Sequence, residues 1–352
     1  MNDPTTDCLD VAGIGVSPLH FIGGRRVASA AAFDLFSPID QRPLGRIAEG
    51  GEAEVDAAIR AAEHAFPAWA ALGAEGRKPF LDRFAAEIGR RAEAFCMLES
   101  NDAGVLLSRM RHGVVPRAML NISWFAEHAL TLQERPLDTP QARHLVRHDP
   151  AGVVAIVTPW NAPLLLSTWK LGPALAAGNA CVLKPPEWAP LTCSLLADAA
   201  EAAGLPPGVL NVVQGSGAHT GAKLVSDARL ARISFTGSVP TGRWIAQAAG
   251  ANLVPCSLEL GGKSPFIVLE GADVDAAAAT GAAARATAAA TSPTRCPGTC
   301  TACPTPTAAT RSWRWRSRPS RVSAAATTVP LPTRTWGATT PPSTSSSTCG
   351  WS

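Results

Sequence analysis

Short apolar runs alternate with alanine-rich stretches along the chain between residues 150 and 270. Runs rich in Val and Ile predict strands at 152–158, 179–184, 209–213, 232–236 and 264–270. The stretches between these runs predict helices at 164–177, 191–203, 220–225 and 241–249. Strands alternate with helices in this way when a parallel sheet is covered on both faces. We therefore expect an α/β fold whose ligand lies past the carboxyl ends of the strands.

Before residue 150 the pattern is mainly helical. Apolar side chains recur at helical spacing over 54–69, and the same spacing returns over 80–88. Residues 119–130 form a third apolar and aromatic segment, and the polar stretch 131–150 leads into a turn. We expect these helices to pack on the sheet and to follow a flexible amino-terminal segment, residues 1–19.

Composition narrows the class of protein. The chain has 352 residues, of which 46% are hydrophobic, so it is long enough for more than one core. No apolar run reaches the roughly 18 residues that span a bilayer, and the first residues lack the basic and apolar blocks of a secretory signal. We therefore expect a cytoplasmic protein with no membrane partner. Lys and Arg are scattered among acidic residues in the main body, which disfavours a nucleic-acid partner.

The composition changes at about Gly281. Residues 281–352 hold eight Arg and no Asp, Glu or Lys, and they consist almost entirely of small residues, Pro, Arg, Cys and Trp. Such a stretch buries too little apolar surface to offset its ordering entropy, so we expect a disordered tail. The complete absence of Glu, Lys and Gln favours translation of a GC-rich gene in the wrong frame. A genuine basic tail is the alternative.

Two polar motifs directly follow predicted strands. In TPWNAP, residues 158–163, the Asn161 amide is able to donate to a developing oxyanion without carrying charge. An Asn and Pro turn that caps the next helix is the alternative. In LKPPEWAP, Lys184 offers a cation and Glu187 an acceptor for a ribose diol, a pairing that suits an adenosine group. The alternative for this pair is a solvated surface contact.

Two glycine motifs follow the next strands. QGSGAHTG, residues 214–221, resembles a dinucleotide loop, but its spacing does not match the GxGxxG fingerprint. SFTGSVPTG places Thr236, Gly237 and Ser238 between a strand and a helix. Free amides and the helix dipole hold a pyrophosphate at such a position. The alternative is an ordinary turn with Ser238 as the helix N-cap.

A lone carboxylate stands in LELGGKSP, residues 258–265. Apolar neighbours are expected to raise the pKa of Glu259 toward neutrality, which suits a general base that activates water. The two glycines beside it let the backbone approach a ligand. The alternative is the end of a strand or helix from which Glu259 only reaches solvent.

Taken in order, TPWNAP, LKPPE, GSGAHTG, FTGSVPTG and LELGGKSPFIV resemble the aldehyde dehydrogenase superfamily, and the resemblance covers residues 20–279. It implies a Rossmann-like parallel sheet with helices on both faces, in which the helix after FTGS receives the pyrophosphate. Most of the catalytic domain is then missing. The implied parts follow one another along the chain. They are a helical part of the NAD-binding domain (20–130), a β-arm used in oligomerisation (131–150), the NAD-binding core (151–262), the start of the catalytic domain (263–280) and the tail (281–352).

The resemblance also implies NAD as cofactor, an aldehyde as substrate, a homodimer or homotetramer, and no metal. Asn161 would be the oxyanion donor, and Glu259 would activate the water that hydrolyses a thioester. Lys184 and Glu187 would bind the adenosine ribose, and Glu187 favours NAD because an acid repels the 2′-phosphate of NADP. The remaining implied cofactor contacts are Thr158, Pro159, Trp160, Gly217, Gly221, Thr236, Gly237, Ser238 and Leu260.

The nucleophilic cysteine of this superfamily stands in a GQxC-like context roughly 30 to 40 residues after the base. Cys296 and Cys300 lie at about that distance, but TRCPGTCTACP lacks this context. We therefore expect this chain to be inactive. A zinc site at the same cysteines would need a second ligand cluster, and none follows. An NAD-binding pseudoenzyme and a gene product without function are the alternatives.

The substrate class rests on one helix. PRAMLNISWFAEHA, residues 116–129, resembles the corresponding helix of hydroxymuconic semialdehyde dehydrogenases, including the carboxymethyl form of aromatic catabolism. The intact protein would then oxidise such a semialdehyde to a carboxylic acid. Betaine aldehyde and general aliphatic or aromatic aldehydes are the alternatives.

Overall fold

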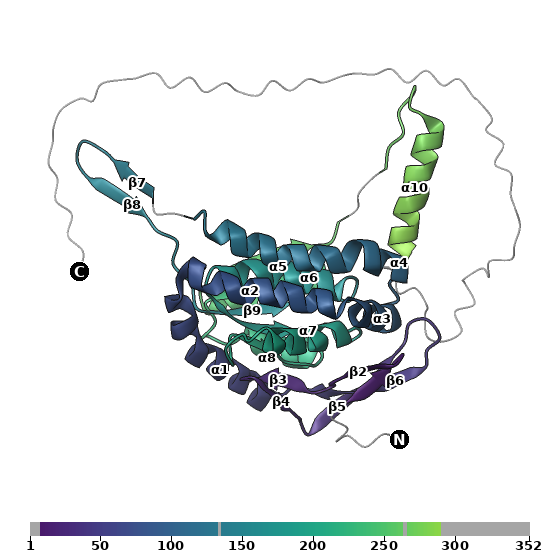
Figure 1. The fold of residues 1–352 in the computed structure, drawn as a ribbon, viewed down its shortest axis with the longest axis horizontal. Coiled ribbons are helices and arrows are strands. Elements are labelled where there is room, and N and C mark those ends of the chain that lie inside the picture. The colour runs from purple at the N-terminus through teal and green to yellow at the C-terminus, as the bar shows by residue number, and fades with distance from the viewer. Residues whose placement is uncertain (1–7, 133–134, 263–265, 290–352) are drawn as a thin grey trace, which may run out of the picture. The chain divides into compact units, whose positions relative to one another are not determined.

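Figure 1 shows the computed structural model, which describes residues 8–132, 135–262 and 266–289. These residues belong to one compact unit, Met1–Arg295. A second unit, Cys296–Ser352, lies outside the described residues. The disorder expected for the tail therefore stays a prediction from residue 290 onward.

A seven-stranded sheet organises the described chain. Its order is β13, β12, β9, β10, β11, β3 and β4. In chain order the bounds are β3 His20–Ile22, β4 Arg25–Val27, β9 Val153–Val157, β10 Ala180–Lys184, β11 Leu210–Val212, β12 Arg232–Gly237 and β13 Cys256–Leu260. The five strands from β13 to β11 are parallel, and β3 and β4 join antiparallel beside β11. The predicted parallel α/β sheet is confirmed.

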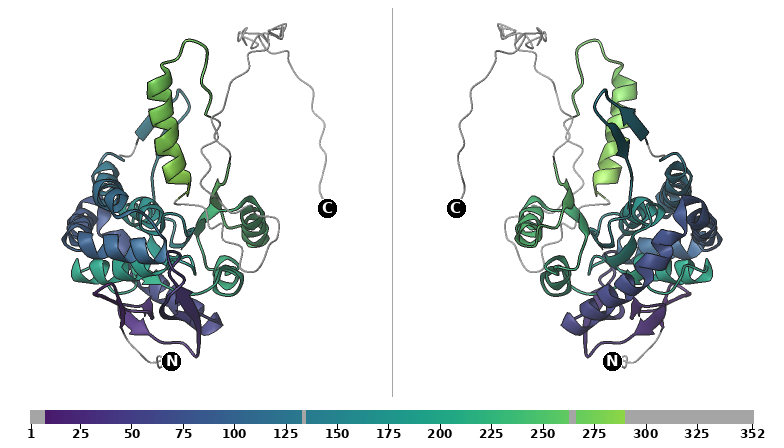
Figure 2. Two further views of the ribbon diagram at one scale, coloured as in Figure 1. Left: turned by 90° about the vertical axis from the view of Figure 1, so that its right-hand side faces the viewer. Right: turned by 90° about the vertical axis from the view of Figure 1, so that its left-hand side faces the viewer.

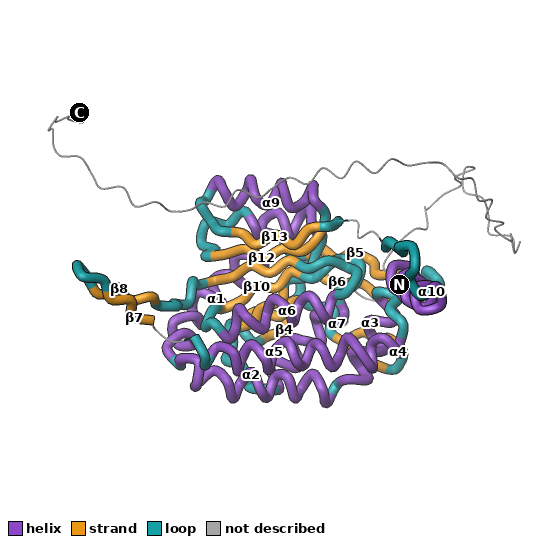
Figure 3. Tube along the Cα trace, turned by 90° about the horizontal axis from the view of Figure 1, so that it is seen from above, coloured by secondary structure: helices purple, strands orange, loops and turns teal. Residues whose placement is uncertain are grey.

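Helices cover both faces of this sheet, as Figures 2 and 3 show. Their bounds are α1 Glu52–Ala71, α2 Gly73–Arg90, α3 Ala92–Asp102, α5 Val115–Ala129, α6 Pro163–Ala176, α7 Leu191–Ala202, α8 Ala222–Val225 and α9 Val239–Ala251. α2, α3, α5, α6 and α7 pack with Val154 and Ile156 of β9 in one core. α1, α8 and α9 pack with Val153, Ala155 and Val157 in the other. Alternate side chains of one strand thus enter opposite cores.

Two short segments join α3 to α5, namely α4, Leu107–Arg109, and the π-helical turn η1, Met110–Val114. The sequence pattern predicted neither of them, and it did not predict α3. Among the described helices, none combines the length and the apolar content that a membrane span requires.

Three two-stranded sheets lie outside the large one. Their strands are β1 Leu9–Val11 with β2 Ile14–Val16, β5 Ala31–Phe36 with β6 Pro43–Glu49, and β7 Arg135–Asp138 with β8 Arg143–Val146. The flexible segment expected over residues 1–19 is therefore wrong for residues 9–16. Leu9, Val11 and Val16 are buried in the main core, and strands of three residues are too short for periodicity to reveal. β7 and β8 fall in the predicted β-arm, whose role in oligomerisation stays a prediction.

The end of the described chain also differs from the expectation. The strand expected at 264–270 is wrong for residues 266–269, which form no strand and expose their apolar side chains. An apolar run becomes a strand only where another strand pairs with it, and β12 already has β9 and β13 on its two sides. α10, Val274–Ala289, continues past Gly281. Residues 281–289 are therefore helical where disorder was expected, because alanine favours a helix.

His20 joins the amino-terminal strands to the central sheet. Its side chain is fully buried, and its Nδ1 accepts a hydrogen bond from the Gln214 amide at 3.0 Å. Burial lowers the pKa of His20 from its ordinary 6.5 to about 4, although the charges of Glu49 and Glu54 oppose that shift. The folded protein therefore holds a neutral imidazole at this junction.

This burial predicts a loss of stability in mild acid. Between pH 6.5 and 4 the unfolded chain binds a proton at His20 and the folded chain does not, so stability falls as the pH drops through this window. The loss attributable to His20 is about 3 kcal/mol. We expect His20→Asn, which keeps an acceptor that does not titrate, to remove this part of the pH dependence in urea unfolding. His64→Asn at an exposed position should leave it unchanged, and equal slopes for wild type and His20→Asn would contradict the assignment.

Candidate cofactor and catalytic site

The loops that carry the predicted motifs all follow parallel strands of the sheet. β9 lies between β10 and β12, and the later strands are added on both of its sides, β10 and β11 on one and β12 and β13 on the other. Open α/β sheets bind ligands beyond the carboxyl ends of the strands at such a change of direction. The fold therefore brings five motifs that are far apart in the sequence to one edge.

The loop after β9 carries Asn161 and the predicted nicotinamide contacts. The Asn161 side-chain oxygen Oδ1 is buried and has no hydrogen-bond partner among the described residues. α6 has Ala162 as its N-cap and no side-chain cap, so Asn161 does not cap this helix as the alternative reading required. Thr158 is buried and its hydroxyl lies 3.4 Å from Ser167 Oγ. Pro159 and Trp160 are half-buried.

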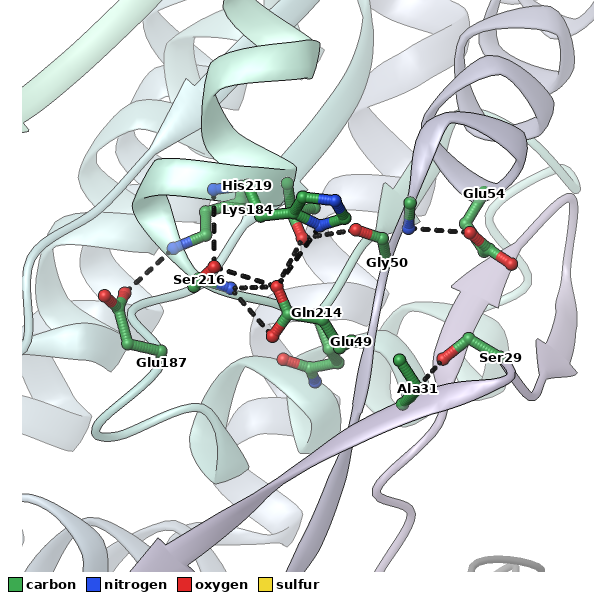
Figure 4. Close-up of polar contacts among 12 residues, drawn as sticks. Ser29, Ala31, Glu49, Gly50, Glu54, Lys184, Glu187, Gln214, Ser216 and His219 are labelled. Atoms are coloured by element: carbon green, nitrogen blue, oxygen red, sulfur yellow. Dashed lines mark hydrogen bonds and ion pairs between the residues drawn. The ribbon is translucent and has the colours of Figure 1, made fainter.

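Lys184 and Glu187 form an ion pair at the end of β10, with 3.0 Å between Nζ and Oε2 (Figure 4). The Lys184 side chain is only 2% exposed, so the alternative of a solvated surface pair is wrong. Burial lowers the pKa of the Lys184 ammonium, while the charge of Glu187 opposes that shift. Burial also disfavours the charged form of Glu187, but Lys184 and nearby backbone amides outweigh it and lower the pKa of that carboxyl.

A carboxylate that the sequence pattern did not reveal holds the next loop. Glu49, at the end of β6, accepts hydrogen bonds from the Ser216 amide at 3.1 Å and from its hydroxyl at 2.8 Å (Figure 4). The Thr220 hydroxyl donates to the Gly50 carbonyl at 2.6 Å. β6 thereby fixes both ends of the turn between Ser216 and Thr220. The charge of Glu49 also acts on Lys184: it favours a higher pKa of that ammonium, against the effect of burial.

The glycines of this loop leave the backbone open beside the ion pair. Residues Gly217–Gly221 form a π-helical turn, η2, and α8 follows it directly. A Cβ at Gly217 would meet only Glu187 Oε1 within 4 Å, at 3.9 Å. A Cβ at Gly221 would lie 3.8 Å from Lys184 Cδ. Both positions are therefore compatible with the predicted cofactor path.

The FTGS turn joins β12 to α9. The Thr236 hydroxyl is buried and has no hydrogen-bond partner among the described residues. Ser238 is the N-cap of α9, and its hydroxyl accepts a hydrogen bond from the Thr241 amide at 3.3 Å. The N-cap reading of Ser238 is thus what the structure shows. Because Pro240 has no N–H and the Thr241 amide already donates to Ser238, the Val239 amide is left in the first turn for an anion. A side chain at Gly237 would collide with the Phe235 ring.

Glu259 and Leu260 end the neighbouring strand. In the parallel register of β12 and β13, Glu259 lies opposite Thr236 and Leu260 opposite Gly237. Glu259 is exposed, so the apolar surroundings expected for it are wrong: strand β13 lies at the edge of the sheet, with β12 on one side only. The Leu260 side chain packs against Gly242 of α9.

Lys170 is a polar residue of this edge that the motifs did not indicate. Its Nζ donates to Ser234 Oγ at 3.0 Å, which ties α6 to β12. Burial lowers the pKa of Lys170, and the charge of Glu259 opposes that shift. A lysine inside the otherwise apolar helix PLLLSTWKLGPALA was the sequence signal that could have found it.

The described residues test neither the predicted absence of a metal nor the prediction that Cys296 and Cys300 are not the nucleophile. Among residues 8–132, 135–262 and 266–289 no group of His, Cys, Asp and Glu is arranged to hold a metal ion. Cys296 and Cys300 lie outside the described residues.

A parallel sheet with helices on both faces and a buried Lys and Glu pair at its carboxyl edge are typical of a nucleotide-binding α/β domain. The chain belongs to the aldehyde dehydrogenase family, whose family model matches residues 26–294. The expected family and fold are therefore confirmed.

Three similar proteins illustrate the match. The 5-carboxymethyl-2-hydroxymuconate semialdehyde dehydrogenase of Escherichia coli is 39% identical over 260 residues, which cover 73% of this chain and 55% of that protein. A mutant indole-3-acetaldehyde dehydrogenase of P. syringae, solved with NAD+ and IAA, is 37% identical with a TM-score of 0.75, covering 78% of this chain and 57% of that one. An NADP-dependent enzyme of E. coli is 35% identical with a TM-score of 0.76, covering 78% and 58%. The chain spans about half the length of the curated relatives it matches.

The bonds of Glu49 predict that the Ser216 loop depends on β6. Glu49→Ala leaves the half-buried Ser216 amide and hydroxyl without their acceptor, which is expected to lower the free energy of unfolding by about 1 to 2 kcal/mol. Glu52→Ala removes a carboxylate that is 89% exposed and should change the free energy of unfolding by less than about 0.5 kcal/mol. Chemical denaturation of both variants checks the difference. Equal stability of the two would refute the anchoring role.

Proposed function

We propose that this chain binds NAD at the carboxyl edge of its sheet and that its protein oxidises an aldehyde to a carboxylic acid. The observation that carries the proposal is the buried ion pair of Lys184 and Glu187 beside Gly217 and Gly221. A buried ammonium group needs an acidic or hydrogen-bonding partner, and the Glu187 carboxylate, which is 35% exposed, can also accept from a ribose diol. The solved P. syringae relative was crystallised with NAD+, which supports the same ligand.

The residues of this edge fit a dinucleotide. Lys184 and Glu187 hold the adenosine ribose, and the start of α9 holds the pyrophosphate through its Val239 amide. The buried and unpartnered Thr236 hydroxyl has a donor to offer on the nicotinamide side, where Thr158, Pro159 and Trp160 also lie. NAD supplies the hydride acceptor when bound.

Two side chains act on the substrate in this proposal. The side-chain NH2 of Asn161 donates to the substrate oxygen on which negative charge develops. Because Oδ1 has no hydrogen-bond partner among the described residues, no bond at that oxygen holds the side-chain amide in another orientation. Glu259 takes a proton from water, which its exposed position at the end of β13 supplies directly. The charge of Glu259 acts on Lys170, whose protonated form it favours. We expect hydrolysis to a free acid because a water-activating base is present.

The substrate we favour carries its own carboxylate. Arg117 of α5 is exposed, and its guanidinium lies 5.2 Å from the centre of the Trp169 ring. Trp169 belongs to α6, so the Arg117 guanidinium lies against the helix that follows Asn161. An arginine stacked on an aromatic ring keeps donors for a carboxylate. A hydroxymuconic semialdehyde carries such a carboxylate, and the E. coli relative is named for a substrate of this kind.

A second function is binding of NAD without turnover. The sequence after Glu259 contains no cysteine in a GQxC context, and a thioester pathway needs that nucleophile. We therefore expect this chain to bind NAD and to produce no NADH alone. The cytoplasmic location, the homo-oligomer and the β-arm at 131–150 stay predictions.

Calorimetry with NAD and NADP tests the cofactor site. Lys184→Met is expected to weaken NAD binding about tenfold, since a charged hydrogen bond to the ligand is lost. Lys78→Met removes a lysine that pairs with Asp82 on α2 and should leave the affinity unchanged. Glu187→Gln removes the charge that repels a 2′-phosphate and should narrow the preference for NAD over NADP about tenfold. Equal affinity of wild type for both dinucleotides would contradict this role of Glu187.

Aldehyde-dependent NADH formation separates the two functions. We expect NAD binding and no NADH above background when the purified chain meets a hydroxymuconic semialdehyde. Turnover that is lost in Glu259→Gln would show that the chain is itself an enzyme. Neither binding nor turnover would overturn both proposals and favour a product without function.

A further inference from the structure

α6 and α7 both begin at the carboxyl edge, and neither carries a cap of its own. α6 follows the Asn161 loop and has Ala162 as N-cap, while α7 follows the Lys184 loop and has Pro190 as N-cap. Neither N-cap residue has a side chain that accepts a hydrogen bond. The first amides of a buried helix need acceptors, so the acceptors must come from elsewhere in the chain.

α3 supplies both acceptors. Glu99 Oε2 accepts a hydrogen bond from the Leu164 amide of α6 at 3.0 Å and from the Thr192 hydroxyl of α7 at 3.0 Å. Asp102 Oδ2 accepts one from the Leu191 amide of α7 at 2.9 Å. Glu99 is fully buried and Asp102 is 2% exposed. One oxygen of Glu99 therefore joins the helix behind Asn161 to the helix behind the Lys184 loop.

A second buried contact connects the same elements. Ser167 Oγ of α6 lies 3.2 Å from Cys193 Sγ of α7 and 3.4 Å from Thr158 Oγ1. Burial raises the pKa of Cys193 to about 12, Glu99 adds to that rise, and Lys184 opposes it. Cys193 thus lies within electrostatic reach of both the carboxylate and the lysine. The polar groups behind the two loops form one connected region.

Burying a carboxylate here has an energetic cost that a purely apolar contact would avoid. Burial raises the pKa of Glu99 to about 7, and the Leu164 amide, the Thr192 hydroxyl and the charge of Arg109 oppose the rise. Asp102 is the other acid in this region, and burial raises its pKa as well. The second oxygen of Glu99, Oε1, has no hydrogen-bond partner among the described residues. The favourable contribution of Glu99 therefore comes from its other oxygen, Oε2, which accepts from both α6 and α7.

We propose that Glu99 is a positioning residue that holds the Thr158–Pro163 loop at a fixed place relative to the Lys184–Pro190 loop. The inference rests on the proposed function, because these loops carry the residues assigned to the nicotinamide and adenosine halves of NAD. A dinucleotide that contacts both loops gains from their fixed spacing, whereas a ligand that contacts only the Lys184–Pro190 loop does not. Glu99 touches neither loop's ligand-facing residues and acts through Leu164 and Thr192.

Hydrogen exchange of the free chain tests the connection without any ligand. Glu99→Leu keeps the volume and removes the acceptor, so the Leu164 amide is expected to exchange at least tenfold faster. Glu99→Gln keeps a carbonyl oxygen and should restore protection to within threefold of wild type. Ser100→Ala is the matched control, because its buried hydroxyl donates to the Val105 carbonyl and to neither loop. Unchanged exchange at Leu164 in folded Glu99→Leu would overturn the proposal.

Calorimetry with NAD and with ADP tests the consequence for binding. Glu99→Leu should weaken NAD about tenfold and ADP less than threefold, whereas a merely structural loss would weaken both alike. Thr192→Val removes only the bond to α7 and should lower the preference for NAD about threefold while Leu164 stays protected. If Glu99→Leu does not fold, Thr192→Val decides, and an unchanged preference for NAD in that variant overturns the proposal. If wild type binds neither ligand, the proposed function fails and the exchange experiment alone judges Glu99.

Discussion

Backbone amides at the start of a buried helix must find acceptors, and the carboxyl edge of this sheet concentrates that requirement. A buried amide left without an acceptor costs about 1 to 3 kcal/mol. Residues from the first third of the chain meet the requirement at three places: Glu49 at the Ser216 loop, Glu99 at α6 and Asp102 at α7. α9 and the turn η2 are instead capped by their own N-cap residues, Ser238 and Ser216. The amino-terminal elements are therefore the frame of the site, although none of the recognisable motifs lies in them.

This division explains how much the sequence could predict. The parallel strands and the helices after residue 150 follow from apolar runs and helical spacing, because each is long enough to show its period. Four of the five motifs directly follow a predicted strand, which is why the sequence could place them at one edge of the sheet; LELGGKSP was recognised by its residues alone. Glu49 and Glu99 were missed because their partners lie 167 and 65 residues away, and no local pattern records such a pairing. Strands β1 to β4 were missed because three residues show no period, and β13 was missed because its edge position leaves its polar side chains exposed.

Two lysines near this edge each have an acidic group close by, in a chain whose main body is acidic. Lys184 and Lys170 lie on neighbouring elements of the edge, and burial lowers the pKa of both. An anionic ligand placed between helix starts and these ammonium groups stabilises their protonated forms. The charges of Glu187 and Glu259 already act in the same direction, so each lysine has an acidic partner within the chain. In the proposed function, the diphosphate of NAD thus approaches ammonium groups whose charge an acidic partner already compensates.

The pairing of β3 with β11 sets a condition on synthesis of the protein. The hydrogen bond between His20 and Gln214 spans 194 residues of sequence, and the antiparallel contact of Phe21 with Val212 closes the same long loop. A ribosome that adds about 5 to 20 residues per second needs roughly 10 to 40 s to supply the missing partner. During that interval the β3 and β4 hairpin presents an unpaired edge. The nascent chain therefore passes through a period of exposure to mispairing that ends only when the central sheet has emerged.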